Sequence, residues 1–263
     1  MKQVILISYL LIHVIAGQAV NQPMDSIHIQ GNEFKVDLLG NIYWTEHTTL
    51  KKYNPDKGNT IEYTNTFLGE IEKYDVSNPL KILVYYETHN QLVFLDKNLR
   101  EIASPISLDN INLSQVGAIC TSHNGGFWIL NSMNQRIEHY NQNLQLTTET
   151  TALQELYNTS STDFTLIERN NMLYCFIPGC CLYTFDLYGN FSKKHPLKIV
   201  NNIQIINKNI FYFYEETLNR YNLNTLDKDT IKVPYSKEKW EDIKILKDGT
   251  QYGLKKKKIY IYK

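Results

Sequence analysis

The chain has 263 residues, and its 27 basic and 27 acidic side chains give a formal net charge of zero. This balance argues against a general electrostatic affinity for nucleic acid or for acidic membranes. Aromatic residues make up 12% of the chain, with 19 tyrosines, and a tyrosine suits a half-buried strand because it combines an apolar body with a polar tip. All-β proteins of this length commonly form a single domain with a core of useful size.

The first 19 residues have the layout of a secretory signal peptide. Lys2 supplies a positive charge, residues 4–15 form a short apolar stretch, and Ala16-Gly17-Gln18-Ala19 provides the small residues of a cleavage site. The apolar stretch is short for a membrane span, which needs about 20 residues; an uncleaved anchor helix is the alternative interpretation. No cysteine stands at the predicted cleavage site, so a lipid anchor is not indicated. We expect a periplasmic or secreted mature chain, residues 20–263, without a transmembrane span.

A strand-like element recurs about every 40 residues after this leader. It is apolar or aromatic and is often introduced by glycine or asparagine, and its copies are Asn41–Glu46, Leu80–Glu87, Gly126–Asn131, Asn171–Ile177, Asn209–Tyr214 and Gly249–Leu254. A second strand follows each copy, usually ending in Asn or Asp, which favour tight turns: Leu50–Asn54, Gln91–Asp96, Arg136–Asn141, Leu182–Asp186, Leu218–Asn222 and Lys258–Tyr262. A further strand precedes each copy: Glu33–Asp37, Ile71–Val76, Val116–Thr121, Phe164–Glu168, Ile203–Ile206 and Ile243–Leu246. A fourth follows the turn, for example Thr60–Phe67, Glu101–Ile106 and Leu144–Thr150.

Four short antiparallel strands in each repeat of about 40 residues are typical of a β-propeller. Helical periodicity is not sustained after the leader, and the nearest segment, Thr151–Tyr157, is long enough for only one or two turns. We therefore predict one all-β domain over residues 20–263, a six-bladed β-propeller with four antiparallel strands per blade. The sixth repeat lacks its fourth strand. The alternating segment Ser26–Gln30 is the expected donor, because its pairing would close the ring and protect two open sheet edges.

The first repeat carries Tyr43-Trp44-Thr45-Glu46 and thereby resembles six-bladed propellers of the YWTD and NHL types. The other repeats have different residues at these positions, such as Phe127-Trp128-Ile129, so the resemblance covers the mature chain as architecture. The second repeat, Asp75–Leu99, is also similar to exported propeller-like proteins of Gram-negative bacteria. These resemblances imply the fold and an exported location, and they bring no particular activity with them.

Four cysteines are present, at positions 120, 175, 180 and 181. In an oxidising compartment some could pair, and Cys175 and Cys180 flank a Pro-Gly turn that permits a bridge without establishing one. Because no C-x-x-C occurs, neither a redox motif nor a zinc knuckle is indicated. Adjacent residues of a strand point to opposite faces, so at most one of Cys180 and Cys181 would face Cys175 or the core. We interpret the cysteines as buried thiols that pack like small apolar side chains.

The turns after the aromatic strands of the first two repeats contain Glu46, His47, Glu87 and His89. In a propeller these four side chains would stand on one rim. Imidazole and carboxylate groups bind metal ions or act as acids and bases, so the rim is a candidate binding site. The alternative is that they are ordinary polar residues of solvated hairpins.

Two connections between repeats are longer than the others, residues 151–162 and 234–240. Long loops on a rigid scaffold are favoured places for recognition, and Tyr157, Tyr235 and Trp240 are of the kind that anchors interfaces. For Trp240 the alternative is packing between blades at the start of the last inner strand.

No catalytic motif is present: the chain lacks G-x-S-x-G, a P-loop and G-x-G-x-x-G. A metal-dependent lactonase-like site would need carboxylates and asparagine at the channel mouth, where Asp37, Asp75, Asn112 and Asp163 are available but follow no motif. Asp37 and Asp75 are better explained as acceptors within turns. We expect neither a metal nor a cofactor.

These observations favour a non-enzymatic exported propeller that acts as an interaction or scaffold protein in the bacterial cell envelope. We expect a monomer whose partner is another envelope protein. The alternative is a small-molecule-binding or metal-assisted hydrolytic propeller that uses the channel or the rim of the first two blades. Three or more carboxylate or imidazole groups converging at the channel mouth would favour this alternative.

Expression with the native leader in a Gram-negative host tests the predicted signal peptide. The intact mass of the exported protein should match a chain that begins at Val20, and Ala19→Arg should block cleavage because the site requires a small residue. A wild-type chain that keeps residues 1–19 and remains in the membrane fraction would instead support the anchor helix.

Overall fold

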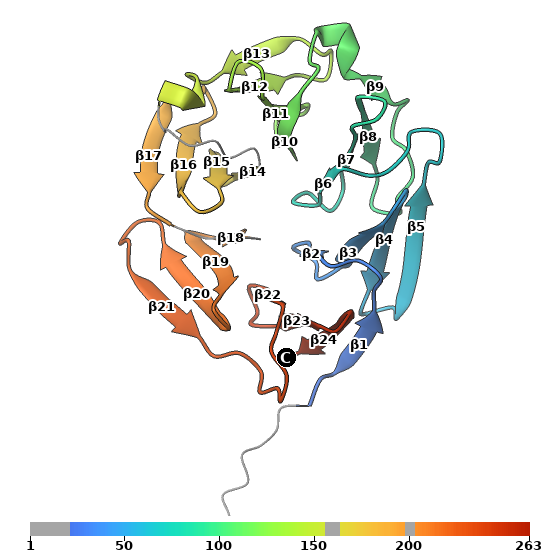
Figure 1. The fold of residues 1–263 in the computed structure, drawn as a ribbon, viewed down its shortest axis with the longest axis vertical. Coiled ribbons are helices and arrows are strands. Elements are labelled where there is room, and N and C mark those ends of the chain that lie inside the picture. Colours follow the sequence, from blue (N-terminus) through green and yellow to red (C-terminus); the bar gives the residue numbers. More distant parts are fainter. Residues whose placement is uncertain (1–21, 156–163, 198–202) are drawn as a thin grey trace, which may run out of the picture.

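The computed structural model of this chain describes residues 22–155, 164–197 and 203–263. Within these residues, 24 strands form six antiparallel sheets of four strands, arranged as blades around a central channel (Figure 1). The first blade contains β2 (Lys35–Val36), β3 (Ile42–Glu46), β4 (Thr49–Asn54) and β5 (Asn59–Thr64), and the second β6 (Lys73–Asp75), β7 (Ile82–Tyr86), β8 (Gln91–Leu95) and β9 (Ile106–Ser107). The third contains β10 (Val116–Thr121), β11 (Phe127–Asn131), β12 (Arg136–Tyr140) and β13 (Leu146–Glu149), and the fourth β14 (Thr165–Arg169), β15 (Met172–Ile177), β16 (Cys181–Asp186) and β17 (Phe191–His195). The fifth contains β18 (Ile203–Ile206), β19 (Asn209–Tyr214), β20 (Thr217–Asn222) and β21 (Lys228–Ile231), and the sixth β22 (Asp242–Ile245), β23 (Gln251–Lys255), β24 (Lys258–Tyr262) and β1 (Asp25–His28).

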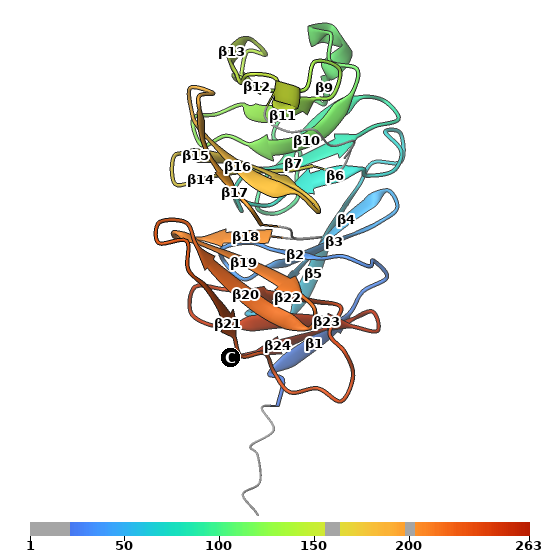
Figure 2. The same cartoon turned by 60° about the vertical axis from the view of Figure 1, so that its left-hand side comes forward.

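The ring is closed by β1, which pairs antiparallel with β24 and completes the sixth blade. Ile27 lies opposite Ile259, and Ile29 continues the ladder by donating its N–H to the Lys257 carbonyl at 2.8 Å. Figure 2 shows the N-terminal strand β1 beside the C-terminal strand β24 in a second view. The predicted closure by the N-terminal segment is therefore confirmed.

The core consists of six apolar clusters, one between each pair of neighbouring blades. The second strand of a blade serves two clusters at once, because successive side chains point to opposite faces. In β3, Tyr43 packs towards the second blade while Ile42 and Trp44 pack towards the sixth. This double burial explains why the second strands are mainly apolar and aromatic, whereas outer strands such as β5 and β17 are largely exposed.

The strands occur close to their predicted positions, with one clear exception. We expected the outer strand of the second blade over Glu101–Ile106, but β9 covers only Ile106–Ser107, and Glu101 makes an isolated bridge to Leu95. Pro105 stands between these two pairings and has no N–H for a ladder, which explains the interruption. Helical structure in the described residues is limited to two 3₁₀ turns, η1 (Leu108–Ile111) and η2 (Leu153–Glu155). None of the described helices is long and apolar enough to span a bilayer.

The cysteines divide into two groups. Cys120 and Cys175 are buried free thiols, as expected, and burial raises the pKa of Cys175 to about 12. The expectation of free thiols is wrong for Cys180 and Cys181, which form a disulfide between adjacent residues. Cys180 lies in the turn before β16 and follows Gly179, whose φ of 72° is left-handed, so the two side chains need not point to opposite faces of a strand.

Deletion of residues 24–31 should strongly destabilise the mature protein. It removes β1, leaves β24 with an open edge, and uncovers the cluster between the sixth and first blades. We expect a loss on the order of 5 kcal/mol, or roughly 10–20 °C in the melting temperature. A chain that begins at Met24 keeps β1 and should melt like the mature protein; unchanged stability of the deletion itself would contradict the role of β1 in closure.

Candidate functional site

The propeller topology gathers two kinds of segment on one face. The chain reverses direction at each strand, so the turns between the second and third strands and the connections between blades share this face. We call it the connection face. It contains the turns after β3 and β7, in which the sequence placed its rim candidates, and the connections 65–72 and 232–241.

The connection 65–72 joins the turns of the first two blades. Its Ile71 N–H donates to the carbonyl of His47 at 3.1 Å, and His47 Nδ1 lies 3.1 Å from the carboxylate of Glu70. Near the middle of this connection, the carbonyl oxygen of Leu68 lies 3.1 Å from His89 Nδ1. The two predicted histidines are therefore linked to one connection, although they are not linked to each other. We call residues 46–48, 65–72 and 87–90 the blade 1–2 rim.

The most prominent side chain of this rim is Phe67, which is 78% exposed. Its ring stacks on His89 with centroids 5.5 Å apart and planes inclined by 30°. The neighbouring Leu68 is only 2% exposed and belongs to the cluster between the first two blades. The buried Leu68 thereby anchors the connection and directs Phe67 outwards. Sequence analysis did not single out Phe67, because an apolar Phe-Leu pair does not reveal which member is exposed.

Glu46 turns away from its predicted companions. Its carboxylate accepts the Trp44 indole N–H at 2.8 Å and forms an ion pair with Lys51 at 2.7 Å. Burial opposes ionisation of this carboxyl, but the bonds from Lys51 and Trp44 outweigh it and hold the pKa of Glu46 below its usual range. Glu46 thus supports the first blade, while Glu87 is exposed in its turn.

Of the two aromatic residues predicted as anchors in the connection 232–241, one is exposed and the other is buried. Tyr235 is 63% exposed on the connection between the fifth and sixth blades. Trp240 is buried, donates its indole N–H to the Pro234 carbonyl at 3.0 Å, and lies so close to Gly253 that a Cβ there would clash with the indole ring. Trp240 therefore packs between blades, which was the alternative interpretation of this residue. Tyr157 lies outside the described residues.

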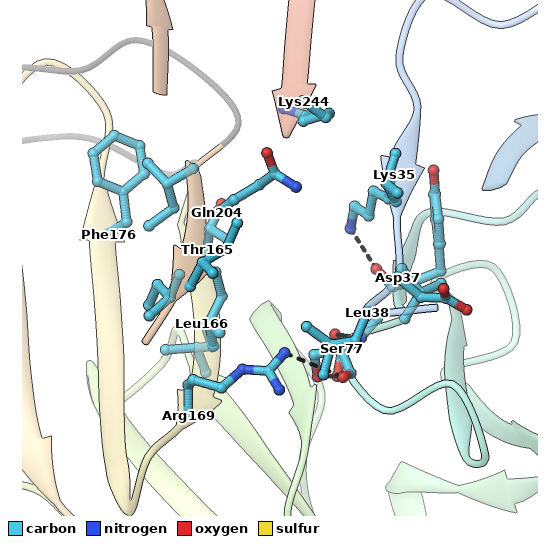
Figure 3. A pocket seen from close by; sticks show the side chains of 18 of the residues that line it. Lys35, Asp37, Leu38, Ser77, Thr165, Leu166, Arg169, Phe176, Gln204 and Lys244 are labelled. Carbon is cyan, nitrogen blue, oxygen red and sulfur yellow. Dashed lines mark hydrogen bonds between the residues drawn. The ribbon is translucent and has the colours of Figure 1, made fainter. Parts of the chain in front are cut away.

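The central channel holds a cavity of about 560 Å³, lined mainly by the first strand of each blade (Figure 3). Lys35, Arg169 and Lys244 contribute cationic groups from the first, fourth and sixth blades. Apolar side chains such as Leu166 and Phe176 line the wall formed by the fourth blade. The sequence placed these strands near the channel but did not identify the cations, because no local pattern shows which side chains of an inner strand reach the cavity.

Asp37 and Asp75 act as turn acceptors, as expected. Asp37 accepts from the N–H groups of residues 39 and 41, the Asn41 amide and the Tyr43 hydroxyl at 2.7–3.0 Å. Burial first, and then this carboxylate, raise the pKa of Tyr43 well above its ordinary value. Asn112 ends η1 in a left-handed conformation, and Asp163 lies outside the described residues. Among the described residues, no three His, Cys, Asp or Glu side chains are arranged to hold a metal ion.

A polar cluster that sequence analysis missed joins the third and fourth blades. Glu168 of β14 accepts the His123 backbone N–H at 3.0 Å and the indole N–H of buried Trp128 at 2.5 Å, and it also contacts the His123 ring. His123 is half-exposed. Burial raises the pKa of Glu168, but these hydrogen bonds outweigh that effect and hold its pKa below the ordinary value. The separation of 40 residues between Trp128 and Glu168 gives no local signal of this contact.

Comparison with known proteins gives structural matches only: no family model and no curated protein matches this chain. Virginiamycin B lyase from Staphylococcus aureus is similar with a TM-score of 0.57 and 14% identity, over 87% of this chain and 80% of that chain. BamB from Moraxella catarrhalis is similar with a TM-score of 0.55 and 10% identity, over 92% and 99%. A chain of the mitotic checkpoint complex reaches a TM-score of 0.62 with 7% identity, over 98% and 99%. At these identities the matches show the propeller fold alone.

Glu168 should make the stability of the protein sensitive to acid. Its lowered folded-state pKa contributes stability that is complete above the ordinary carboxyl pKa of about 4.5 and is lost as the pH falls through the folded value. Glu168→Gln places an amide in a site built from N–H donors, so we expect a loss of about 1–3 kcal/mol at pH 7. Below about pH 4 the difference from the wild type should shrink.

Denaturant unfolding from pH 3 to pH 7 measures this effect. The control is Glu149→Gln, because Glu149 forms an exposed ion pair with Arg136 at 2.9 Å and should contribute less than about 1 kcal/mol. Equal and pH-independent effects of the two substitutions would contradict the assignment.

Proposed function

We propose that this chain is a non-enzymatic exported propeller that serves as an interaction scaffold in the bacterial cell envelope, and that the blade 1–2 rim docks its protein partner. The observation that carries the proposal is the Phe67–His89 stack, an aromatic pair exposed on a rim that buried Leu68 holds in place. Aromatic side chains on rigid supports are typical anchors of protein interfaces, because they bury a large area at little cost in side-chain entropy.

The surroundings of the stack fit a protein partner. The His47–Glu70 pair beside it is exposed and supplies polar groups for the edge of an interface. Tyr235, on another connection of the same face, offers a second exposed aromatic contact. The export of the chain to the envelope follows from the predicted leader, residues 1–19, and is part of the proposal.

The structurally similar proteins are compatible with such a role but do not define it. One similar chain is a component of the mitotic checkpoint complex, so this fold occurs in a multi-protein assembly. Another is a lyase by name, and we do not carry that activity over. The metal-assisted alternative requires converging donors, an arrangement that the described residues lack. The ligand-binding alternative has the channel cavity in its favour.

Site-specific photo-crosslinking in native envelopes tests the docking surface. A photoreactive phenylalanine analogue at position 67 should give a discrete adduct with one envelope protein. The matched control is position 188, because Tyr188 is also an exposed aromatic residue, 83% accessible, but lies in a turn of the opposite face. An absence of any adduct at position 67, or the same adduct at both positions, would contradict docking at the rim.

Substitution provides an independent readout of the same surface. Phe67→Ala should lower recovery of the crosslinked partner at least about fivefold, because it removes the aromatic anchor. Its melting temperature should change by less than about 2 °C, because an exposed side chain contributes little to folding. Tyr188→Ala should leave both quantities unchanged, and equal recovery with Phe67→Ala would count against the proposal.

A further inference from the structure

Two of the four carboxylates that line the central channel, Asp37 and Asp75, are engaged by neutral hydrogen-bond donors. Asp75 accepts four hydrogen bonds, at 2.8–2.9 Å, from the N–H and hydroxyl groups of Ser77 and Thr121. Asp37 likewise accepts four from its own turn and from Tyr43. A carboxylate has about four lone-pair sites, two on each oxygen, so the Asp37 carboxylate is saturated by neutral donors. In Asp75, three of the four bonds fall on Oδ2 and one on Oδ1.

The channel cations, in contrast, are held by backbone carbonyls. Arg169 donates from Nη2 to the Ser77 carbonyl at 3.2 Å, and its Nε is buried without a hydrogen-bond partner among the residues that the structure describes. Lys35 donates to the Tyr74 carbonyl and lies 4.3 Å from the centre of the Tyr74 ring. A guanidinium has five N–H donors in a planar fork that matches an oxyanion, so Arg169 keeps unused directional capacity.

These two cations approach the same short segment from different blades. Arg169 comes from the fourth blade and Lys35 from the first, and their acceptors, Ser77 and Tyr74, are three positions apart in the second blade. Figure 3 shows both donated hydrogen bonds at the edge of the cavity. The two positive charges therefore flank one part of the channel, beside Asp75.

Positive charges in the channel also act on one another. Burial lowers the pKa of Lys35, and the charges of Lys244 and Lys73 lower it further, against the opposing effects of Asp75 and Glu33. Lys244 is itself paired with Asp242 at 2.9 Å. A bound anion near Lys35 would relieve this repulsion and raise the pKa of its ammonium group.

The total charge of the lining does not by itself select an anion, because five basic and four acidic residues contribute to it. The hydrogen-bonding state is the selective feature, since Asp37 and Asp75 are engaged by neutral donors whereas the Arg169 fork keeps unused donors. Apolar side chains of the fourth and fifth blades, among them Leu166, Phe176 and Ile203, also line the cavity. A volume of about 560 Å³ is within the ordinary range for small-molecule sites.

We infer that the central channel is a binding site for a small organic carboxylate with an apolar body. Its carboxylate lies on the fork of Arg169, with Lys35 supplying positive charge, and its apolar body packs against Leu166 and Phe176. This site is separate from the blade 1–2 rim, so it does not depend on the proposed scaffold role.

Isothermal titration calorimetry with octanoate tests the inference on the mature wild-type chain. Octanoate should bind saturably with one site per chain, and neutral octanamide should bind at least about tenfold more weakly, because it cannot form charge-assisted bonds with the guanidinium. Arg169→Gln should weaken octanoate binding at least about tenfold. The control Arg100→Gln makes the same chemical change in an exposed turn and should leave binding unchanged.

Three results would overturn the inference: no saturable octanoate binding at millimolar concentration, equal binding of octanoate and octanamide, or undiminished binding by folded Arg169→Gln. A measurement on the wild type covers the case in which Arg169→Gln does not fold. After reductive ¹³C-methylation of the lysines, saturating octanoate should raise the pKa of Lys35 measured by NMR and leave that of exposed Lys97 unchanged. An unchanged Lys35 titration would place the ligand outside the channel.

Discussion

The pairing of β1 with β24 is the interaction on which the rest of the structure depends. The apolar faces of each blade are covered only by its two neighbouring blades. A blade at the end of an open row would therefore leave one apolar face exposed to water. An unclosed ring would expose the edge of β24 and the cluster that contains Trp44 and Ile259. Closure joins the two ends of the chain in one sheet, and it is reinforced by the contact of Asp25 with the Tyr53 hydroxyl in the first blade.

The same packing determines where function is available. Second strands are buried on both faces and third strands largely so, which leaves turns, connections and the channel wall for recognition. On the connection face, a buried leucine makes a short connection rigid and exposes the phenylalanine beside it. In the channel, the ring brings together Lys35 and Arg169, which are far apart in sequence, at one segment of the second blade. The two places offer different interactions. The rim exposes aromatic surface, and the channel contains cationic hydrogen-bond donors that are not fully used.

Much of the fold could be predicted from local pattern, and much less of the site. The repeat of apolar strands and Asn or Asp turns predicted the blades, and alternation in Ser26–Gln30 predicted the closing strand. The outer strand of the second blade was overestimated because Pro105 ends its ladder. At the rim, the sequence identified His47 and His89 but missed Phe67. Glu46 shows why a turn carboxylate is ambiguous, since the structure directs it to Trp44 and Lys51.

The sequence by itself determined the number of blades, the three inner strands of each repeat and the identity of the strand that closes the ring. These properties follow from periodicity and turn chemistry, which act between residues close in the chain. The tertiary structure alone decided which polar groups meet across blades. Examples are Glu168 with Trp128, and Arg169 with the Ser77 carbonyl, 92 positions away. Such contacts depend on the curvature of the ring and on which side of an inner strand faces the channel. No local pattern in the sequence carries either of these.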